Sequence, residues 1–123
     1  MWVNGSFGLL QRAALNMVLN AVKFSPENAV VNVKLGIVNL HAVISVINAG
    51  LGISKNEQLF LFKRFSRIDG TSTEREGTGL GLYFVQTVAD KHHGYADVDS
   101  DIGKNTCFTL RIPMLSFNLS LAD

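Results

Sequence analysis

The sequence lacks three features that mark secreted, membrane-embedded or nucleic-acid-binding proteins: paired cysteines, long apolar runs and an excess of one charge. Its single cysteine, Cys107, cannot form a disulfide within the chain, which fits a reducing compartment. The apolar runs are far shorter than the roughly 20 residues of a membrane helix, and no basic segment followed by an apolar one opens the chain. We therefore expect no membrane segment and no export signal. The net charge of +1 argues against an electrostatic nucleic-acid binder.

Charged residues and prolines are also scarce, whereas glycine is abundant. Charged side chains make up 17% of the chain, too few for a coiled coil, and hydrophobic ones make up 47%, too many for a disordered protein. The 123 residues suffice for one domain with one hydrophobic core. The chain has 2 prolines and 11 glycines, and several of the glycines fall at apparent breaks between structural elements: Gly50, Gly52, Gly77, Gly79, Gly81 and Gly103.

Hydrophobic spacing predicts two long helices and one short one. Apolar residues at helical spacing favour a helix over residues 7–24, N-capped by Ser6, because they would share one face. The same spacing predicts a helix over residues 80–93, with Gly94 at its C′ position. The segment Ser54–Glu57 has the pattern of a capping box, serine with glutamate three residues later, so a short helix begins there.

Strands are expected from apolar or alternating runs at residues 30–35, 41–48, 95–100 and 106–112. The first two would form an antiparallel hairpin across residues 36–40, and the last two a closing hairpin. Apolar groups on both faces of residues 41–48 suggest a central strand, and the polar residues 69–78 are expected to form a mobile loop. This order of elements predicts an α+β two-layer sandwich, with helices on one face of a mixed β-sheet.

The C-terminal tail is separated from this predicted domain. We expect residues 1–113 to form the domain and residues 114–123 to form the tail. Residues 115–121 alternate apolar side chains with serine or asparagine, so they would form an extra edge strand or contact a partner.

Asn16, Asn20 and Lys23 form a polar stripe on the first predicted helix. At i, i+4 and i+7 they lie within about 60° of each other around the helix. Such a stripe is either a solvated helix face or a face that binds metal and phosphate. Amide oxygens are hard ligands suited to Mg²⁺, and a lysine is a point charge for phosphate.

The run GTGLG at residues 77–81 precedes the last predicted helix directly. Glycines allow backbone N–H groups to approach an anion closely, and the helix dipole adds positive potential, so the run fits a phosphate site. Tight turns and helix packing also require glycine. The run is not a P-loop, because no Lys-Ser or Lys-Thr follows it. It is not a convincing dinucleotide fingerprint either, because a polar loop rather than a strand precedes it.

In this order, five segments resemble the motifs of sensor histidine kinases. They correspond to the asparagine box, the first glycine box, the phenylalanine box and the second and third glycine boxes of that family. The segments are NMVLNAVKFSP (16–26), NAGLGI (48–53), LFKRFSR (61–67), GTGLGL (77–82) and GKNTCF (103–108). The resemblance covers residues 9–113, and five motifs in the right order are far more specific than any one of them.

The resemblance implies a Bergerat-type fold that holds ATP between its helices and its sheet. By this match Asn20 and Lys23 are the catalytic candidates: Asn20 would coordinate Mg²⁺ that bridges the phosphates, and Lys23 would meet a phosphate. Asn16 would support the same polar pocket. Asn48 would receive the adenine amino group, and further residues would line the adenine side, with glycines that let the backbone approach the base: Gly50, Gly52, Ile53 and Thr106.

The resemblance also implies a lid over the phosphates. The second glycine box would close over them, with the preceding loop as the lid, through Gly77, Thr78, Gly79, Leu80 and Gly81. Phe62 and Phe65 would anchor the lid, and Arg64 or Arg67 would reach the phosphates. Aromatic residues at such spacing also fit a hydrophobic core, so Phe62, Phe65 and Phe108 have that alternative.

The chain departs from the family pattern at Asn48 and Asn105. The family has aspartate at the first position. An amide oxygen can still accept a hydrogen bond from the adenine amine, although its NH₂ group can oppose the wrong atom. Replacing a charged hydrogen bond by a neutral one costs about 1 kcal/mol, or about fivefold in affinity. Asn105 often corresponds to glycine in the family, and asparagine tolerates left-handed backbone.

None of the three histidines fits the phosphoacceptor that such kinases carry on a separate dimerisation domain. His41 falls in a predicted strand, and His92 and His93 end a helix, where cations are favoured. The resemblance therefore implies a cytoplasmic catalytic module that is not competent alone. It would bind ATP and Mg²⁺ and transfer the γ-phosphoryl group to a histidine on a dimerisation domain of a longer kinase, with a response regulator downstream.

Two alternatives remain open from the sequence. Asn48 also fits a degenerate nucleotide-binding module with a regulatory or interaction role. The other alternative is a gyrase-like ATPase or an anti-sigma-factor kinase on the same fold, which the phenylalanine box and the run GTGLGL disfavour. Gyrase-like enzymes also use a glutamate base on the first helix, and no acidic residue lies between Leu9 and Pro26.

Overall fold

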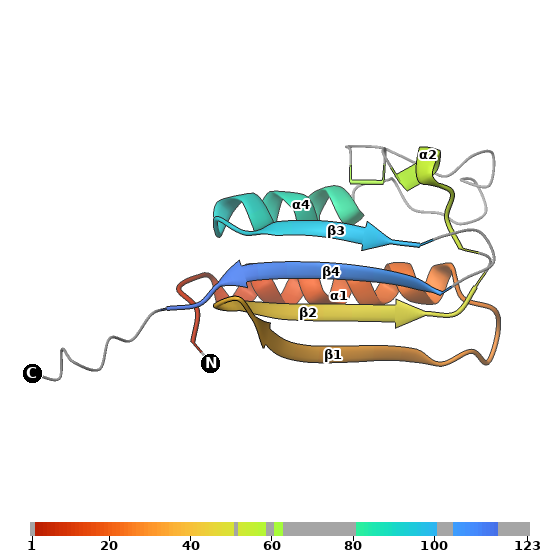
Figure 1. Ribbon diagram of the computed structural model, residues 1–123, viewed down its shortest axis with the longest axis horizontal. Coiled ribbons are helices and arrows are strands. Elements are labelled where there is room, and N and C mark those ends of the chain that lie inside the picture. The colour runs from red at the N-terminus through yellow and green to blue at the C-terminus, as the bar shows by residue number, and fades with distance from the viewer. Residues whose placement is uncertain (1, 51, 59–60, 63–80, 101–104, 116–123) are drawn as a thin grey trace, which may run out of the picture.

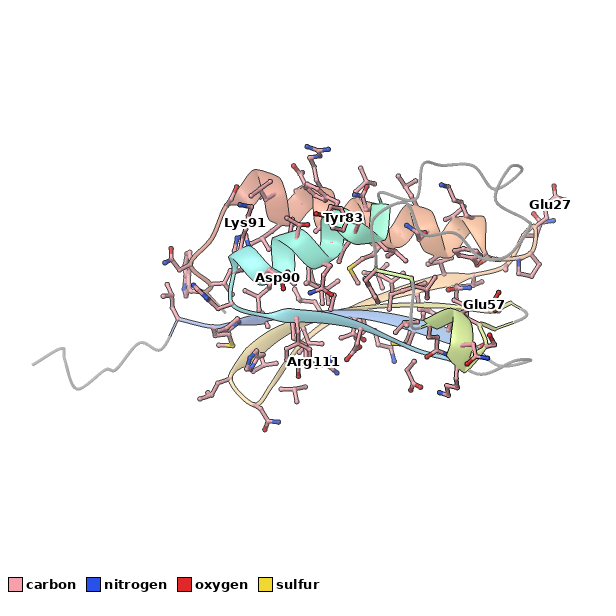
Figure 2. All side chains as sticks on the ribbon, turned by 90° about the horizontal axis from the view of Figure 1, so that it is seen from above. Glu27, Glu57, Tyr83, Asp90, Lys91 and Arg111 are labelled. Atoms are coloured by element: carbon pink, nitrogen blue, oxygen red, sulfur yellow. The ribbon has the colours of Figure 1, made fainter. Side chains whose placement is uncertain are left out.

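The computed structural model describes residues 2–50, 52–58, 61–62, 81–100 and 105–115 (Figure 1). Its helices and strands follow the predicted order. They are α1 (Phe7–Lys23), β1 (Val31–Val38), β2 (His41–Asn48), α2 (Lys55–Gln58), α4 (Gly81–Lys91), β3 (Tyr95–Asp99) and β4 (Thr106–Pro113). The long helices α1 and α4 lie side by side on one face of the sheet, as Figure 2 shows from above. The expected loop 69–78 lies outside the described residues.

The sheet has the strand order β1-β2-β4-β3, and β2 is a central strand as its apolar faces predict. All three pairings between these strands are antiparallel, so the expectation of a mixed sheet is wrong for the described strands. The reason is topological. The connection through α2 and α4 returns the chain to β3 in the same direction as β2, but β4 lies between them and pairs antiparallel with both.

The first hairpin turns more tightly than the sequence predicts. Val38 pairs with His41, so the connection consists of Asn39 and Leu40 alone, and both have positive φ, 50° and 63°. Two such residues form the turn type whose twist matches the right-handed twist of the flanking strands. Gly36, which was expected in the turn, lies within β1 instead.

The helix ends confirm two predicted caps and correct a third. Ser6 accepts the Leu9 N–H at 3.2 Å, and Ser54 and Glu57 form the capping box reciprocally, through Glu57 N–H to Ser54 Oγ at 3.2 Å and Ser54 N–H to Glu57 Oε1 at 3.3 Å. At the end of α4, His93 rather than Gly94 takes the left-handed C′ conformation, with φ of 61°. The prediction for Gly94 is therefore wrong by one residue.

Glycine is required at position 94 because a side chain would not fit there, and not because of its backbone dihedral angles. Its N–H donates to the Ala89 carbonyl at 2.8 Å and the His93 N–H donates to the Asp90 carbonyl at 3.2 Å, which is the Schellman pattern. A Cβ atom at Gly94 would collide with the carbonyl oxygen of Arg111 on β4. The missing side chain thus lets the chain pass directly over the sheet as it leaves α4.

The hydrophobic core fills the space between the helices and the sheet. α1 contributes Met17 and small alanines, and α4 contributes two valines, a leucine and an alanine. The sheet contributes larger side chains, and Phe108 and Leu110 are among the fully buried ones. The core alternative for Phe108 is thus confirmed. No helix in the described part of the chain is long and apolar enough to cross a membrane.

The two ends of the described chain meet at the edge of the fold. Val3 forms an isolated antiparallel bridge with Met114, and the Leu115 N–H donates to the Trp2 carbonyl at 2.7 Å. The chain is therefore held as far as Leu115, two residues past the predicted boundary of the domain. The rest of the alternating tail, residues 116–123, lies outside the described residues, so its expected edge strand stays a prediction.

Candidate functional site

The polar residues of the sequence motifs lie at one end of the molecule. In Figure 1 this is the right-hand end, where α1 and β2 finish and β4 begins, with the start of α4 nearer the middle. Figure 2 shows Glu27, just after α1, and Glu57 on α2 at the same end from a second direction. Segments that are far apart in the sequence therefore share one region between the two layers.

The asparagines of α1 face the start of α4. Asn16 donates its amide hydrogen to the carbonyl of Gly81 at 3.4 Å, and Asn20 donates to the carbonyl of Asn16, one turn back, at 3.0 Å. A Cβ atom at Gly81 would lie 3.1 Å from the Asn20 amide nitrogen, tighter than ordinary contact. Both amides are half-buried, and each uses its nitrogen atom in the hydrogen bond described above. Their oxygen atoms can therefore accept a hydrogen bond or bind a cation.

Asn48 lies at the end of β2 and is 1% exposed. Its Nδ2 donates to the backbone carbonyl of Ala49 at 3.1 Å, whereas its Oδ1 is buried and has no hydrogen-bond partner among the described residues. A buried polar atom without a partner costs about 1–3 kcal/mol, and such atoms are rare in folded proteins. The structure therefore presents a single acceptor oxygen here, held in one orientation by the Ala49 carbonyl.

Thr106 lies directly opposite Asn48 in the pairing of β2 with β4, and it is 2% exposed. Its hydroxyl is 2.7 Å from the hydroxyl of Ser100, the residue after β3. The sequence motifs include Thr106 but do not include Ser100. No pattern in the sequence distinguishes that serine, because its role depends on the pairing of β3 with β4 and on the path of the chain after β2.

The residues of the first glycine box have different physical roles. Gly52 has φ of 80°, a backbone conformation that favours glycine. A Cβ atom at Gly50 would lie 2.6 Å from the carbonyl oxygen of Phe24, so Gly50 allows this loop to approach the end of α1. Ile53 is buried in the hydrophobic core, and its N–H donates to the Ser100 hydroxyl at 3.0 Å.

The phosphate-side candidates are described only in part. Lys23 is exposed in the last turn of α1, where the helix dipole favours a cation. Phe62 is half-buried and packs against the core, which fits both a core residue and an anchor for the lid. The remaining predicted residues of this side lie outside the described residues, and their roles stay predictions: Arg64, Phe65, Arg67, Gly77, Thr78, Gly79 and Leu80.

Comparison with known proteins defines the class. Residues 6–116 match the family model described as "Histidine kinase-, DNA gyrase B-, and HSP90-like ATPase". The match covers most of the chain, so the chain belongs to this family of ATPases.

Within the family the chain resembles sensor histidine kinases. It is 34% identical over 113 residues to sensor histidine kinase RppB of Synechocystis sp., and 39% identical over 112 residues to the sensor-like histidine kinase SenX3 of Mycolicibacterium smegmatis. These alignments cover 91% and 90% of this chain, but only 25% and 29% of the two relatives. The chain thus spans little more than a quarter of the length of these curated relatives.

Solved structures show the same fold. The mycobacterial sensor histidine kinase MprB matches with a TM-score of 0.81 and 32% identity, over 94% of this chain and 78% of that one. The structure of full-length ShkA in complex with AMPPNP matches with a TM-score of 0.77 and 26% identity, over 89% of this chain and 22% of that one. The predicted α+β fold and the predicted resemblance to sensor histidine kinase ATP-binding domains are both confirmed.

Proposed function

We propose that this chain binds ATP with Mg²⁺ and positions the γ-phosphoryl group for transfer to a histidine on a separate dimerisation domain of a longer kinase. The observation that carries the proposal is the oxygen of Asn48, a buried acceptor without a partner among the described residues, opposite Thr106 at the polar end of the two layers. Membership of the ATPase family supports ATP as the ligand, and the polar residues between the helices and the sheet support this region as its binding site.

The orientation of Asn48 matches an adenine amine. Because the amide NH₂ group donates to the Ala49 carbonyl, the atom that remains for a ligand is the oxygen. Adenine carries a donor at its exocyclic amine, whereas guanine carries a carbonyl acceptor at the corresponding position. Asn48 would therefore act as the family's aspartate does, with a neutral hydrogen bond in place of a charged one. This removes the main reason for treating the chain as a degenerate module.

The asparagine face of α1 fits magnesium and phosphate. Asn20 would hold Mg²⁺ through its amide oxygen, a hard ligand, with Asn16 supporting it from one turn before. When bound, the ion neutralises charge on the phosphates. Lys23, one turn further on, would meet a phosphate. We extend the proposal to the lid, in which Phe62 and Arg67 would act with residues 77–81.

The acceptor histidine would belong to another domain, as in the family, and two of the three histidines of this chain have other contacts. His92 is 8% exposed, and both of its ring nitrogens are hydrogen-bonded, Nδ1 to the Val88 carbonyl at 2.8 Å and Nε2 to the Ser6 N–H at 3.0 Å. His41 contacts the Asn39 carbonyl and the Tyr95 ring. A response regulator would then receive the phosphoryl group in the cytoplasm.

Titration calorimetry with Mg²⁺ and ATP tests the proposal. We expect the wild-type chain to bind ATP and Asn20→Ala to lose binding, because the substitution removes the proposed metal ligand. Gln11→Ala, which removes an exposed amide from the same helix, is the matched control and should bind as the wild type does. Absence of binding by the wild type at millimolar ATP would contradict the proposal.

A further inference from the structure

Ser100 is the centre of a hydrogen-bond network that joins three segments far apart in the sequence. It follows β3 and is 3% exposed. Its hydroxyl accepts the Ile53 N–H at 3.0 Å and lies 2.7 Å from Thr106 Oγ1. Its carbonyl accepts from Gln58 Nε2 at 2.7 Å and from Lys55 Nζ at 3.1 Å. One residue thus connects the segment after β2, the end of β3 and the start of β4.

The hydroxyl of Ser100 restricts the orientation of the Thr106 hydroxyl. A serine hydroxyl has one hydrogen and two acceptor positions, and the Ile53 N–H occupies one of these positions. Ser100 therefore either donates its hydrogen to Thr106 or accepts the Thr106 hydrogen. In both arrangements the Thr106 oxygen stays 2.7 Å from the Ser100 oxygen, so the Thr106 side chain keeps one position beside Asn48 on the neighbouring strand. When Ser100 donates, the Thr106 hydrogen is available to a ligand.

The carbonyl of Ser100 holds the segment that carries α2. Gln58 donates both to this carbonyl and to the carbonyl of Ile53 at 2.8 Å, so one amide group links the two segments. A helix of four residues is not stable by itself. α2 therefore depends on these contacts, and they in turn keep the Ile53 N–H aimed at the Ser100 hydroxyl.

We propose that Ser100 is a positioning residue for the adenine base, because it orients the Thr106 hydroxyl that lies opposite Asn48. This inference rests on the proposed function, since it requires the base to lie beside Asn48 and Thr106. Ser100 acts through Thr106 and does not touch the nucleotide itself. Its contribution to ATP affinity should therefore be present only when the Thr106 hydroxyl is present, whereas a merely structural serine would contribute equally in both cases.

A double-mutant cycle on the 123-residue chain separates these cases. ATP affinity with Mg²⁺ is measured by calorimetry for the wild type, Ser100→Ala, Thr106→Val and the double variant. We expect Ser100→Ala to weaken ATP binding about fivefold in the wild-type background, the effect of one neutral hydrogen bond. In the Thr106→Val background the same change should have almost no effect. Ser45→Ala, on the other face of β2, is the matched control and should bind as the wild type does.

Equal losses in the two backgrounds, or no loss with Ser100→Ala, would overturn the positioning role. If Ser100→Ala does not fold, Ser100→Cys carries the same cycle, because its sulfur is nearly isosteric but a weaker hydrogen-bonding group. A wild type that binds no ATP would overturn the proposed function and this inference with it. A wild type that binds ATP without coupling between the two positions overturns this inference alone.

Discussion

Replacing Asn48 with aspartate introduces the residue of the family pattern, yet the structure predicts that it destabilises the free protein. The amide nitrogen of Asn48 donates to the Ala49 carbonyl at 3.1 Å. In the aspartate variant a carboxylate oxygen would face this carbonyl oxygen, and a charge would be buried in a side chain that is 1% exposed. The variant loses a hydrogen bond and gains an unfavourable electrostatic contact.

The magnitude follows from these two effects. A neutral hydrogen bond contributes about 1 kcal/mol, and a buried polar group without a partner costs about 1–3 kcal/mol, more when it is charged. We expect the free energy of unfolding to fall by about 2–4 kcal/mol at neutral pH. The affinity for ATP should rise by about fivefold, because the adenine amine would then donate to a charged acceptor.

The loss of stability should depend on pH with a defined sign. A protonated carboxyl group can donate to the Ala49 carbonyl as the amide does, so the fold favours the neutral acid and raises the pKa of the introduced carboxyl. Stability is then retained below the ordinary aspartate pKa of about 3.9 and is lost as the pH rises above it. The difference between the variant and the wild type should therefore widen from acidic to neutral pH.

Urea unfolding at several pH values measures this difference. Asn32→Asp is the matched control, because it makes the same change of charge at an exposed position of β1 and should alter stability by less than about 0.5 kcal/mol. If Asn48→Asp is as stable as the wild type at neutral pH, the assigned orientation of the Asn48 amide is incorrect. The Asn48 oxygen would then not be the atom that is free to accept the adenine amine.

Two further substitutions test the fold around the site by urea unfolding. Gly94→Ala should destabilise the protein by about 2 kcal/mol or more, because its Cβ atom would collide with the Arg111 carbonyl. The control Gly8→Ala has open space around it in α1 and should be neutral or stabilising by up to about 1 kcal/mol. Equal effects of the two substitutions would show that the close contact at Gly94 does not limit stability. His92→Leu should cost about 1–3 kcal/mol, because it removes the acceptor of the Ser6 N–H and one of the two donors to the Val88 carbonyl. An unchanged unfolding midpoint would show that these hydrogen bonds contribute nothing.

The sequence predicts the elements whose signals are local. α1 and the capping box of α2 follow from side-chain spacing and from hydrogen bonds over three residues, and the bounds of β2 agree with its apolar run. These signals need no knowledge of distant parts of the chain. The motifs of the nucleotide site are also local segments, which is why their order in the sequence was enough to indicate the family.

Features that depend on distant contacts could not be predicted in this way. The insertion of β4 between β2 and β3 determines that the described sheet is antiparallel, and no local pattern records it. His92 was expected to favour a cationic role at the end of α4, but the approach of the N-terminal segment makes it a buried hydrogen-bonding group. Ser100 likewise gains its role from the meeting of three segments.

Three described polar side chains of the candidate site, Asn48, Thr106 and Asn20, are held in place by other groups of the protein. The Ala49 carbonyl orients Asn48, Ser100 orients Thr106, and the backbone of Asn16 orients Asn20. These site side chains are neutral, in a chain whose net charge is only +1. Polar groups that are fixed before a ligand arrives lose little conformational freedom on binding, so they can contribute affinity without a strong local charge. Under the proposed function, this arrangement would let a nearly neutral domain bind ATP, while Mg²⁺, Lys23 and the remaining family motifs would neutralise the phosphates.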